Sequence, residues 1–101
     1  MDDAIVPSQI YQLIHTDATF IDLRDDYSFD QLHIKNFINM SSDQLLSSMH
    51  QFPLDKPIYL ICYTGKQSRK VCQKLRSLGY DSYYIQGGFD AFLSIPPAKY
   101  Y

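Results

Sequence analysis

Short apolar runs alternate with helix-like stretches along the chain, and this alternation predicts the secondary structure. The runs at 20–23, 37–40, 58–61 and 82–85 are rich in Ile, Phe and Tyr and predict strands, of which those over 20–23 and 58–61 are expected to be buried. Apolar residues spaced three or four positions apart predict helices over about 8–15, from Asp25 to about 32, behind Ser41, over 68–78 and after Gly87-Gly88. Strands that alternate with helices indicate an α/β fold with a mostly parallel sheet and sites at the carboxyl ends of its strands.

Polar residues at the ends of these stretches indicate where helices begin and end. Ser8 is a predicted N-cap for the first helix, and Ser41 followed by Gln44 has the form of a capping box. Gly79 is a natural C-terminal stop for the helix over 68–78, and Pro96-Pro97 is expected to end the last one.

Composition adds the size and class of the protein. A chain of 101 residues with 46% hydrophobic and 20% charged residues is ordinary for a soluble protein, and we expect one domain over residues 1–101. No apolar run approaches the roughly 18 residues of a membrane span. The acidic start, soon interrupted by Pro7, is unlike a secretion signal, so we expect a cytoplasmic protein that does not associate with membranes.

Charge is unevenly distributed. The formal net charge of −2 argues against a nucleic-acid partner. Cations nevertheless gather within one stretch, at Lys66, Arg69, Lys70, Lys74 and Arg76. One interpretation is a solvated helix face; the other is that Lys66 and Arg69 attract an anionic substrate.

Cys62 is the candidate nucleophile because of its position. It ends the apolar run 58–61 and opens a polar loop with Gly65, and the predicted helix begins at Ser68. Backbone N–H groups gathered at such a place stabilise negative charge, and the thiolate is the reactive form of cysteine. The alternative is a small apolar residue at a strand end.

The second cysteine has a structural interpretation. Cys72 falls on the apolar face of the predicted helix with Val71 and Leu75. A helix of that length separates it from Cys62 by more than the roughly 7 Å that a disulfide allows between Cα atoms. We therefore expect two free thiols, as in a reducing compartment.

Four segments in order resemble the rhodanese-like sulfurtransferases in their small single-domain form. They are Ile21-Asp22-Leu23-Arg24, then Phe29 with His33-Ile34 and Ile38-Asn39, then Cys62-Tyr63-Thr64-Gly65-Lys66-Gln67-Ser68, and finally Leu78-Gly79-Tyr80 with Gly87-Gly88-Phe89. The resemblance implies a small three-layer α/β sandwich, with helices on both faces of the sheet.

The resemblance also implies an enzyme that works through a persulfide on Cys62. The cysteine would take the outer sulfur of a small anionic donor such as thiosulfate and pass it to cyanide, a thiol or an acceptor protein. No metal or cofactor is implied, and we expect a monomer or weak dimer. The residues implied to bind substrate are Tyr63, Thr64, Gly65, Lys66, Gln67, Ser68 and Arg69. Asp22 and Arg24 are predicted to form a structural ion pair below the site, and His33 to be structural.

Departures from the family pattern bear on specificity. Gln67 stands where the loop often has arginine, so Lys66 and Arg69 are the cations that would compensate. A phosphatase or arsenate reductase of this architecture would need arginine where Ser68 stands, which argues against that chemistry. A sulfur relay between proteins and a binding module without turnover are the remaining alternatives.

Overall fold

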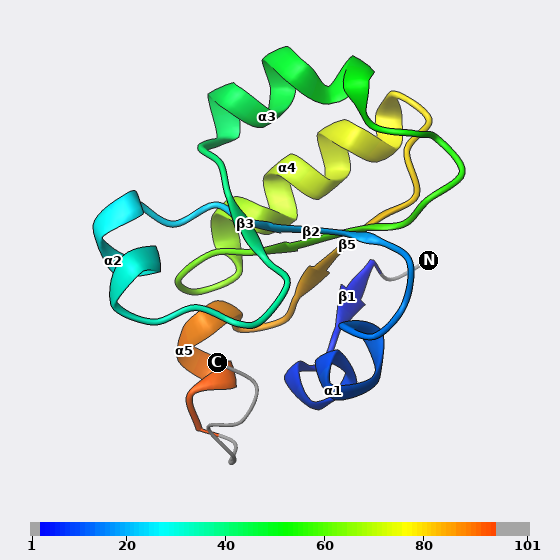
Figure 1. The fold of residues 1–101 in the computed structure, drawn as a ribbon. Helices are drawn as coiled ribbons and strands as arrows, with labels where there is room; N and C mark the ends of the chain where they lie inside the picture. The colour runs from blue at the N-terminus through cyan, green and yellow to red at the C-terminus, as the bar shows by residue number, and fades with distance from the viewer. Residues whose placement is uncertain (1–2, 95–101) are drawn as a thin grey trace.

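A computed structural model describes residues 3–94, which form a five-stranded sheet covered by helices (Figure 1). All strand pairs are parallel, in the order β1-β5-β4-β2-β3. The strands are β1 Ala4–Ile5, β2 Thr19–Asp22, β3 Ile38–Asn39, β4 Ile58–Ile61 and β5 Ser82–Ile85. The α-helices are α1 Ile10–Leu13, α2 Asp26–Gln31, α3 Ser42–Ser48, α4 Lys66–Ser77 and α5 Gly88–Phe92, with 3-10 turns at Pro7–Gln9 and Met49–Gln51.

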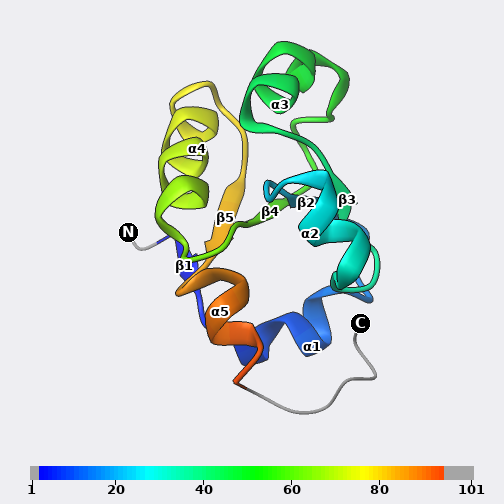
Figure 2. The same ribbon diagram turned by 90° about the vertical axis from the view of Figure 1, so that its left-hand side faces the viewer.

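Helices cover both faces of the sheet, as predicted. Figures 1 and 2 show α3 and α4 on one face and α1 and α5 on the other, while α2 follows the carboxyl end of β2. No helix within residues 3–94 is long and apolar enough to cross a membrane.

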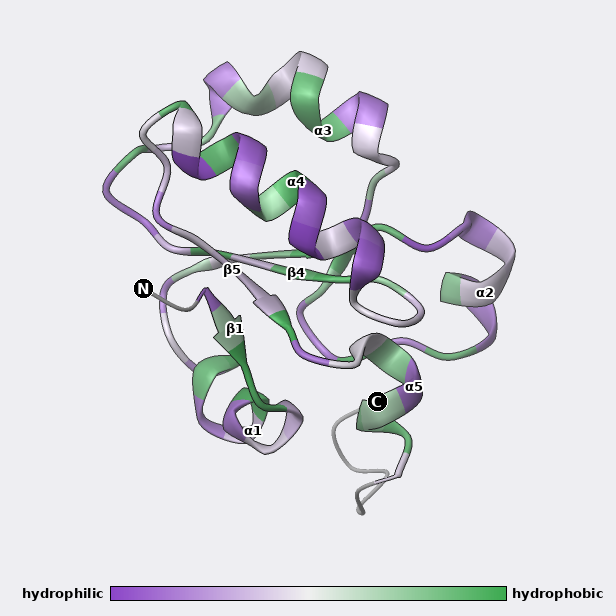
Figure 3. Cartoon of the chain, turned by 180° about the vertical axis from the view of Figure 1, so that it is seen from behind, coloured by the Kyte–Doolittle hydropathy of each residue, from purple (hydrophilic) through white to green (hydrophobic). Residues whose placement is uncertain are grey.

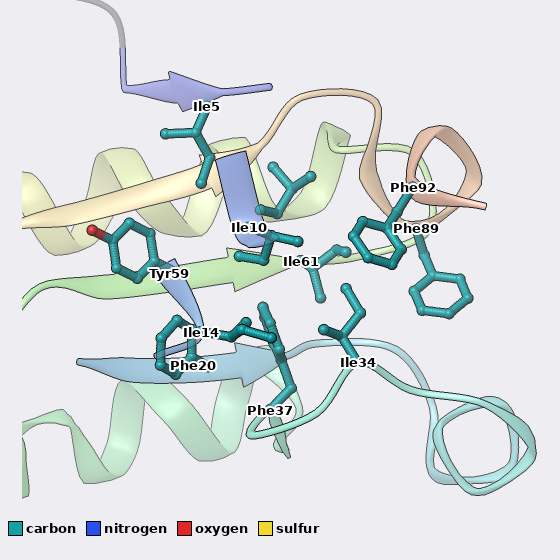
Figure 4. Close-up of a cluster of buried hydrophobic side chains, with 11 residues drawn as sticks. Ile5, Ile10, Ile14, Phe20, Ile34, Phe37, Tyr59, Ile61, Phe89 and Phe92 are labelled. Atoms are coloured by element: carbon teal, nitrogen blue, oxygen red, sulfur yellow. The ribbon is translucent and has the colours of Figure 1, made fainter. Parts of the chain in front are cut away.

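Alternating side chains of the central strands build a separate core on each face. On the α1 and α5 face, the rings of Phe20 and Tyr59 stack with centroids 5.5 Å apart, and Ile61 packs in the same cluster (Figure 4). On the other face, Ile21 and Leu60 pack with the apolar sides of α3 and α4. Because β4 contributes to both cores and every one of its residues is buried, the position of its carboxyl end is firmly determined.

Most predicted elements are confirmed. The strands over 58–61 and 82–85 have the predicted bounds. The capping box is present, since the amide of Gln44 donates to Ser41 Oγ at 3.1 Å and the amide of Ser41 donates to Gln44 Oε1 at 2.8 Å. Gly79 ends the helical path with a φ of 95°, as a C-terminal stop requires.

The N-terminal prediction was partly wrong. The stretch over 8–15 is a 3-10 turn followed by the short α1, and Ser8 lies inside the turn rather than capping it. The side chain of Gln9 instead accepts the amide of Val6 at 2.8 Å. Strand β1 was not predicted; it pairs with β5, where Ala4 faces Tyr84.

The other boundary error affects the site directly. Helix α4 begins at Lys66, not at the predicted Ser68, so the loop after Cys62 is shorter than expected. The expected helix stop at Pro96-Pro97 lies outside the described residues.

Candidate active site

Cys62 lies at the carboxyl end of β4, where its sulfur receives backbone hydrogen bonds. The amides of Gly65 and Ser68 each donate to Cys62 Sγ at 3.2 Å. The thiol itself donates to Ser68 Oγ at 3.2 Å, and that hydroxyl donates onward to the carbonyl of Gly65, also at 3.2 Å. Two N–H dipoles directed at one sulfur favour negative charge there, so this position suits a nucleophilic cysteine.

The loop reaches this geometry because Gly65 adopts a left-handed conformation. Its φ of 92° turns the chain directly into α4, which brings the first amides of the helix round to the sulfur. The helix is held in place by its buried side, where Val71, Cys72 and Leu75 join the core. Packing far from the site therefore determines where these amides point.

The start of α5 supports the loop from the other side. The amide of Phe89 donates to the carbonyl of Cys62 at 2.7 Å, and the amide of Asp90 donates to that of Tyr63 at 3.0 Å. Gly88 makes this approach possible, because a Cβ on it would lie 2.5 Å from the Cys62 carbonyl oxygen and 2.6 Å from the Gly65 nitrogen. Only glycine fits at this contact.

A pocket of about 270 Å³ opens in front of the sulfur. Its lining consists of Cys62, Tyr63, Thr64, Lys66, Gln67 and Lys70. Lys66 and Lys70 are one helical turn apart and bring two cationic side chains to the pocket wall. A small anion is the ligand that this lining favours.

The structure divides the predicted substrate-binding residues between several positions. Arg69 lies outside the pocket and lines a second hollow of about 310 Å³ together with Gln86 and Gly87, while Thr64 and Lys66 border both hollows. Gln67 lines the pocket, but its side-chain Nε2 donates to Ser42 Oγ at 2.6 Å. Ser68 and Gly65 are buried and contact the sulfur instead of the pocket wall.

Tyr63 joins the loop to α2. Its hydroxyl donates to the carboxylate of Asp25 and lies 2.9 Å from Ser28 Oγ. Asp25 is also the N-cap of α2 and accepts the amide of Ser28 at 2.7 Å. The hydrogen bond from Tyr63, followed by that from the Ser28 amide, lowers the pKa of the Asp25 carboxyl below its ordinary value.

The predicted ion pair between Asp22 and Arg24 is confirmed, and the Arg24 guanidinium lies 5.9 Å from the centroid of the Tyr63 ring. Both residues are buried, and Nη2 of Arg24 lies 2.9 Å from Asp22 Oδ2. The same nitrogen donates to the carbonyl of Leu32 at 2.6 Å, and the guanidinium lies 3.7 Å from the centroid of the Phe89 ring. Arg24 therefore links β2, the segment after α2, and α5.

His33 and Cys72, which the sequence predicted to be structural, both pack against neighbouring residues of the fold. His33 stacks on Phe29 with centroids 3.8 Å apart, and its Nδ1 lies 2.8 Å from the carbonyl oxygen of Phe29. Cys72 is buried, and this burial raises the pKa of its thiol. Within the described part of the chain, no cluster of His, Cys, Asp and Glu could hold a metal ion.

Lys70 and Asp25 were not predicted as part of this site. Lys70 follows Lys66 by four residues, so a helix predicted to start at Lys66 would have placed both on one face. Asp25 was predicted only as a helix cap, and nothing in its local sequence indicates the contact with Tyr63.

Comparison with known proteins identifies the family. The family described as Rhodanese-like domain matches residues 6–95. The chain belongs to this family. It is 29% identical to the thiosulfate sulfurtransferase GlpE of Pseudomonas syringae over 96 residues, which cover 94% of this chain and 91% of that protein. It is 33% identical to the protein of the same name from Vibrio cholerae over 76 residues, or 74% and 72% of the two chains.

Solved rhodanese-like structures share the fold. The reduced CoADR-RHD protein of Bacillus anthracis superposes with a TM-score of 0.82 at 27% identity over 90% of this chain, although the match spans only 16% of that longer chain. A rhodanese-like domain protein from Staphylococcus aureus gives a TM-score of 0.79 at 23% identity and 91% coverage of both chains.

Proposed function

We propose that this protein is a sulfurtransferase that carries a sulfane sulfur as a persulfide on Cys62. The observation that carries the proposal is the pair of backbone N–H groups on Cys62 Sγ at the base of a pocket that two lysines border. Membership of the rhodanese-like family and similarity to proteins named thiosulfate sulfurtransferase support sulfur transfer as the reaction class.

The first half-reaction loads the sulfur. The Cys62 thiolate attacks the outer sulfur of a small anionic donor such as thiosulfate, the S–S bond of the donor breaks, and sulfite leaves with the bonding electrons. The amides of Gly65 and Ser68 would stabilise both the thiolate and the persulfide anion. Lys66 and Lys70 would hold the anionic end of the donor, while Arg69, at the neighbouring hollow, would act only at longer range.

The second half-reaction transfers the sulfane sulfur from Cys62 to an acceptor. Cyanide, a thiol or a cysteine of an acceptor protein attacks the terminal sulfur, and the electron pair of the broken S–S bond returns to Cys62. The sulfane sulfur keeps its oxidation level, so the cycle needs no metal or redox cofactor. Both cysteines are free thiols, which fits a reducing, cytoplasmic setting.

Intact-mass spectrometry before and after incubation with thiosulfate tests the proposal. We expect a mass increase of one sulfur that cyanide or a thiol removes, that Cys62→Ser abolishes and that Cys72→Ser retains. Addition of sulfur to the Cys62→Ser variant would refute the site. If the wild type gains no sulfur from thiosulfate or from a small-molecule persulfide, the sulfurtransferase proposal is wrong.

A further inference from the structure

The outward side of α4 is a basic surface without acidic partners. Lys66, Arg69, Lys70 and Lys74 are all exposed, and the helix contains no acidic residue. None of these side chains makes an ion pair with any residue in the range 3–94. Figure 3 shows hydrophilic residues along this side of the helix. We call these residues the basic face.

Three other cations in the described structure are neutralised locally, and Lys35 is the exception. Arg24 pairs with Asp22, Lys56 with Asp17, and Arg76 with Asp3. The chain as a whole is acidic, with a formal net charge of −2, so the unpaired cations on α4 are not a consequence of overall composition. Such a concentration of one charge attracts an anionic partner of similar extent.

The basic face is continuous with the pocket of Cys62 but extends beyond it. Lys66 and Lys70 line the pocket, whereas Lys74 lies a further turn along α4. At 1.5 Å per residue, Lys74 is about 12 Å along the helix from Lys66. A donor anion held in the pocket would use only the first part of the face, so the remainder matches a larger partner.

The opposite side of the pocket mouth carries the other charge. Tyr63 borders the pocket and contacts Asp25, and Asp26 and Asp30 are exposed on the adjoining helix α2. A uniformly anionic polymer such as nucleic acid would be repelled on that side. A folded protein or peptide can present acidic residues to α4 alone, so this arrangement favours a protein partner.

We propose that the basic face docks a thiol protein whose acceptor cysteine is surrounded by aspartate and glutamate. The inference rests on the proposed function and deepens it by naming the class of acceptor. In the complex, the acceptor thiolate attacks the terminal sulfur of the Cys62 persulfide. A new S–S bond forms on the acceptor, the old one breaks, and its electron pair leaves Cys62 as a thiolate, so no external oxidant or reductant is consumed.

The docking test does not depend on sulfur chemistry. The probe is a ten-residue peptide with a central serine flanked by aspartate and glutamate, titrated into the ¹⁵N-labelled protein at low ionic strength. We expect the NMR chemical shifts of backbone amides on α4 and in the loop after Cys62 to change as the peptide binds. Lys74→Glu should weaken binding about fivefold, since one charge is reversed beside an anionic ligand. Lys35→Glu, the same change on the exposed segment after α2, should alter binding by less than about twofold.

The linked transfer test uses the same peptide with cysteine in place of serine. The rate of sulfur transfer from persulfide-loaded protein should fall in Lys74→Glu but not in Lys35→Glu, and the difference should vanish at about 0.5 M salt. Failure to load Cys62 would refute the proposed function, and the serine-peptide titration would still decide the docking.

Three results of the peptide titrations would overturn the docking proposal. They are equal binding of a peptide with lysine in place of the acidic residues, equal effects of the two charge reversals, and amide shifts away from α4. Tighter binding of a single-stranded oligonucleotide than of the acidic peptide, with the same shifts, would assign the face to nucleic acid and would equally reject a protein partner.

Discussion

At the scale of single residues, a cation closer to Cys62 along the sequence can lie outside the pocket that a more distant cation lines. Arg69 and Lys70 are adjacent and both exposed, yet they leave the helix about 100° apart. Lys70 therefore borders the Cys62 pocket and Arg69 the second hollow. Charge interactions fall off with distance and with salt, so a difference of one residue on a helix changes which side chain meets the substrate.

Neutralising these two cations should therefore have unequal effects. Lys70→Gln should raise the KM for thiosulfate about fivefold, because it removes an ammonium group from the pocket wall. Arg69→Gln is the matched control and should give a clearly smaller increase. Steady-state kinetics at low and high ionic strength measure both, and the Lys70 effect should shrink as salt is added. A larger effect at Arg69 would show that the anion binds in the second hollow.

At the scale of elements, the site depends on the close approach of α5 to the loop after β4. Local patterns predicted both elements but not their contact, in which Gly88 lies against the backbone of Cys62 and Gly65. Gly79 also has positive φ, but a Cβ added there would meet nothing within 4 Å. Gly79 is therefore required only for its backbone conformation, whereas Gly88 is required for both its conformation and its close contact with the loop.

Alanine at these two positions should reveal the difference. Gly79→Ala should cost about 1 kcal/mol of stability, the penalty for a side chain in the left-handed region. Gly88→Ala should cost about 3 kcal/mol or more, because its Cβ also collides with backbone atoms, and it should lower sulfur transfer by displacing the loop. Urea unfolding and activity per folded molecule measure the two effects; equal stability losses would contradict the close-contact argument.

At the scale of the whole molecule, the buried pair of Asp22 and Arg24 connects segments that are distant in sequence. Besides Asp22, the guanidinium contacts the Leu32 carbonyl and the Phe89 ring. The side-chain nitrogen Nδ2 of Asn39 donates to the carbonyls of Asp22 and Arg24 at 3.0 and 2.8 Å. A charge removed from water at this junction needs its partner.

Asp22→Asn should consequently destabilise the protein by about 3 kcal/mol, since the buried guanidinium would lose its counter-charge. Asp17→Asn makes the same change in an exposed ion pair, in which the side chain of Asp17 is 83% accessible and that of Lys56 is 43% accessible. It should lower the free energy of unfolding by about 0.5 kcal/mol or less. Urea unfolding of both variants against the wild type measures the difference. Similar losses would mean that the buried pair is not a structural junction.

Local patterns predicted most of the fold and the position of Cys62 at the end of a strand. Continuous apolar runs indicated the strands over 58–61 and 82–85, because a strand inside the sheet buries most of its side chains. The capping box at Ser41 depends on residues three positions apart. Strand β1 lacked such a signal, because its two residues become a strand only by pairing with β5. The start of α4 was missed for a related reason, since Gly65 turns the chain where it meets Gly87 and Gly88.

The sequence by itself determined the α/β order of elements, the thiol at a strand end and the family to which the chain belongs. Only the tertiary structure decided which side chains share the pocket with Cys62: Lys70 enters it, Arg69 does not, and Asp25 binds Tyr63 across the mouth. The physical reason is the distance along the chain over which each kind of interaction acts. Periodicity and caps arise from residues within a few positions of one another, whereas the pocket is made where the ends of separate elements are brought together by burial of both faces of the sheet.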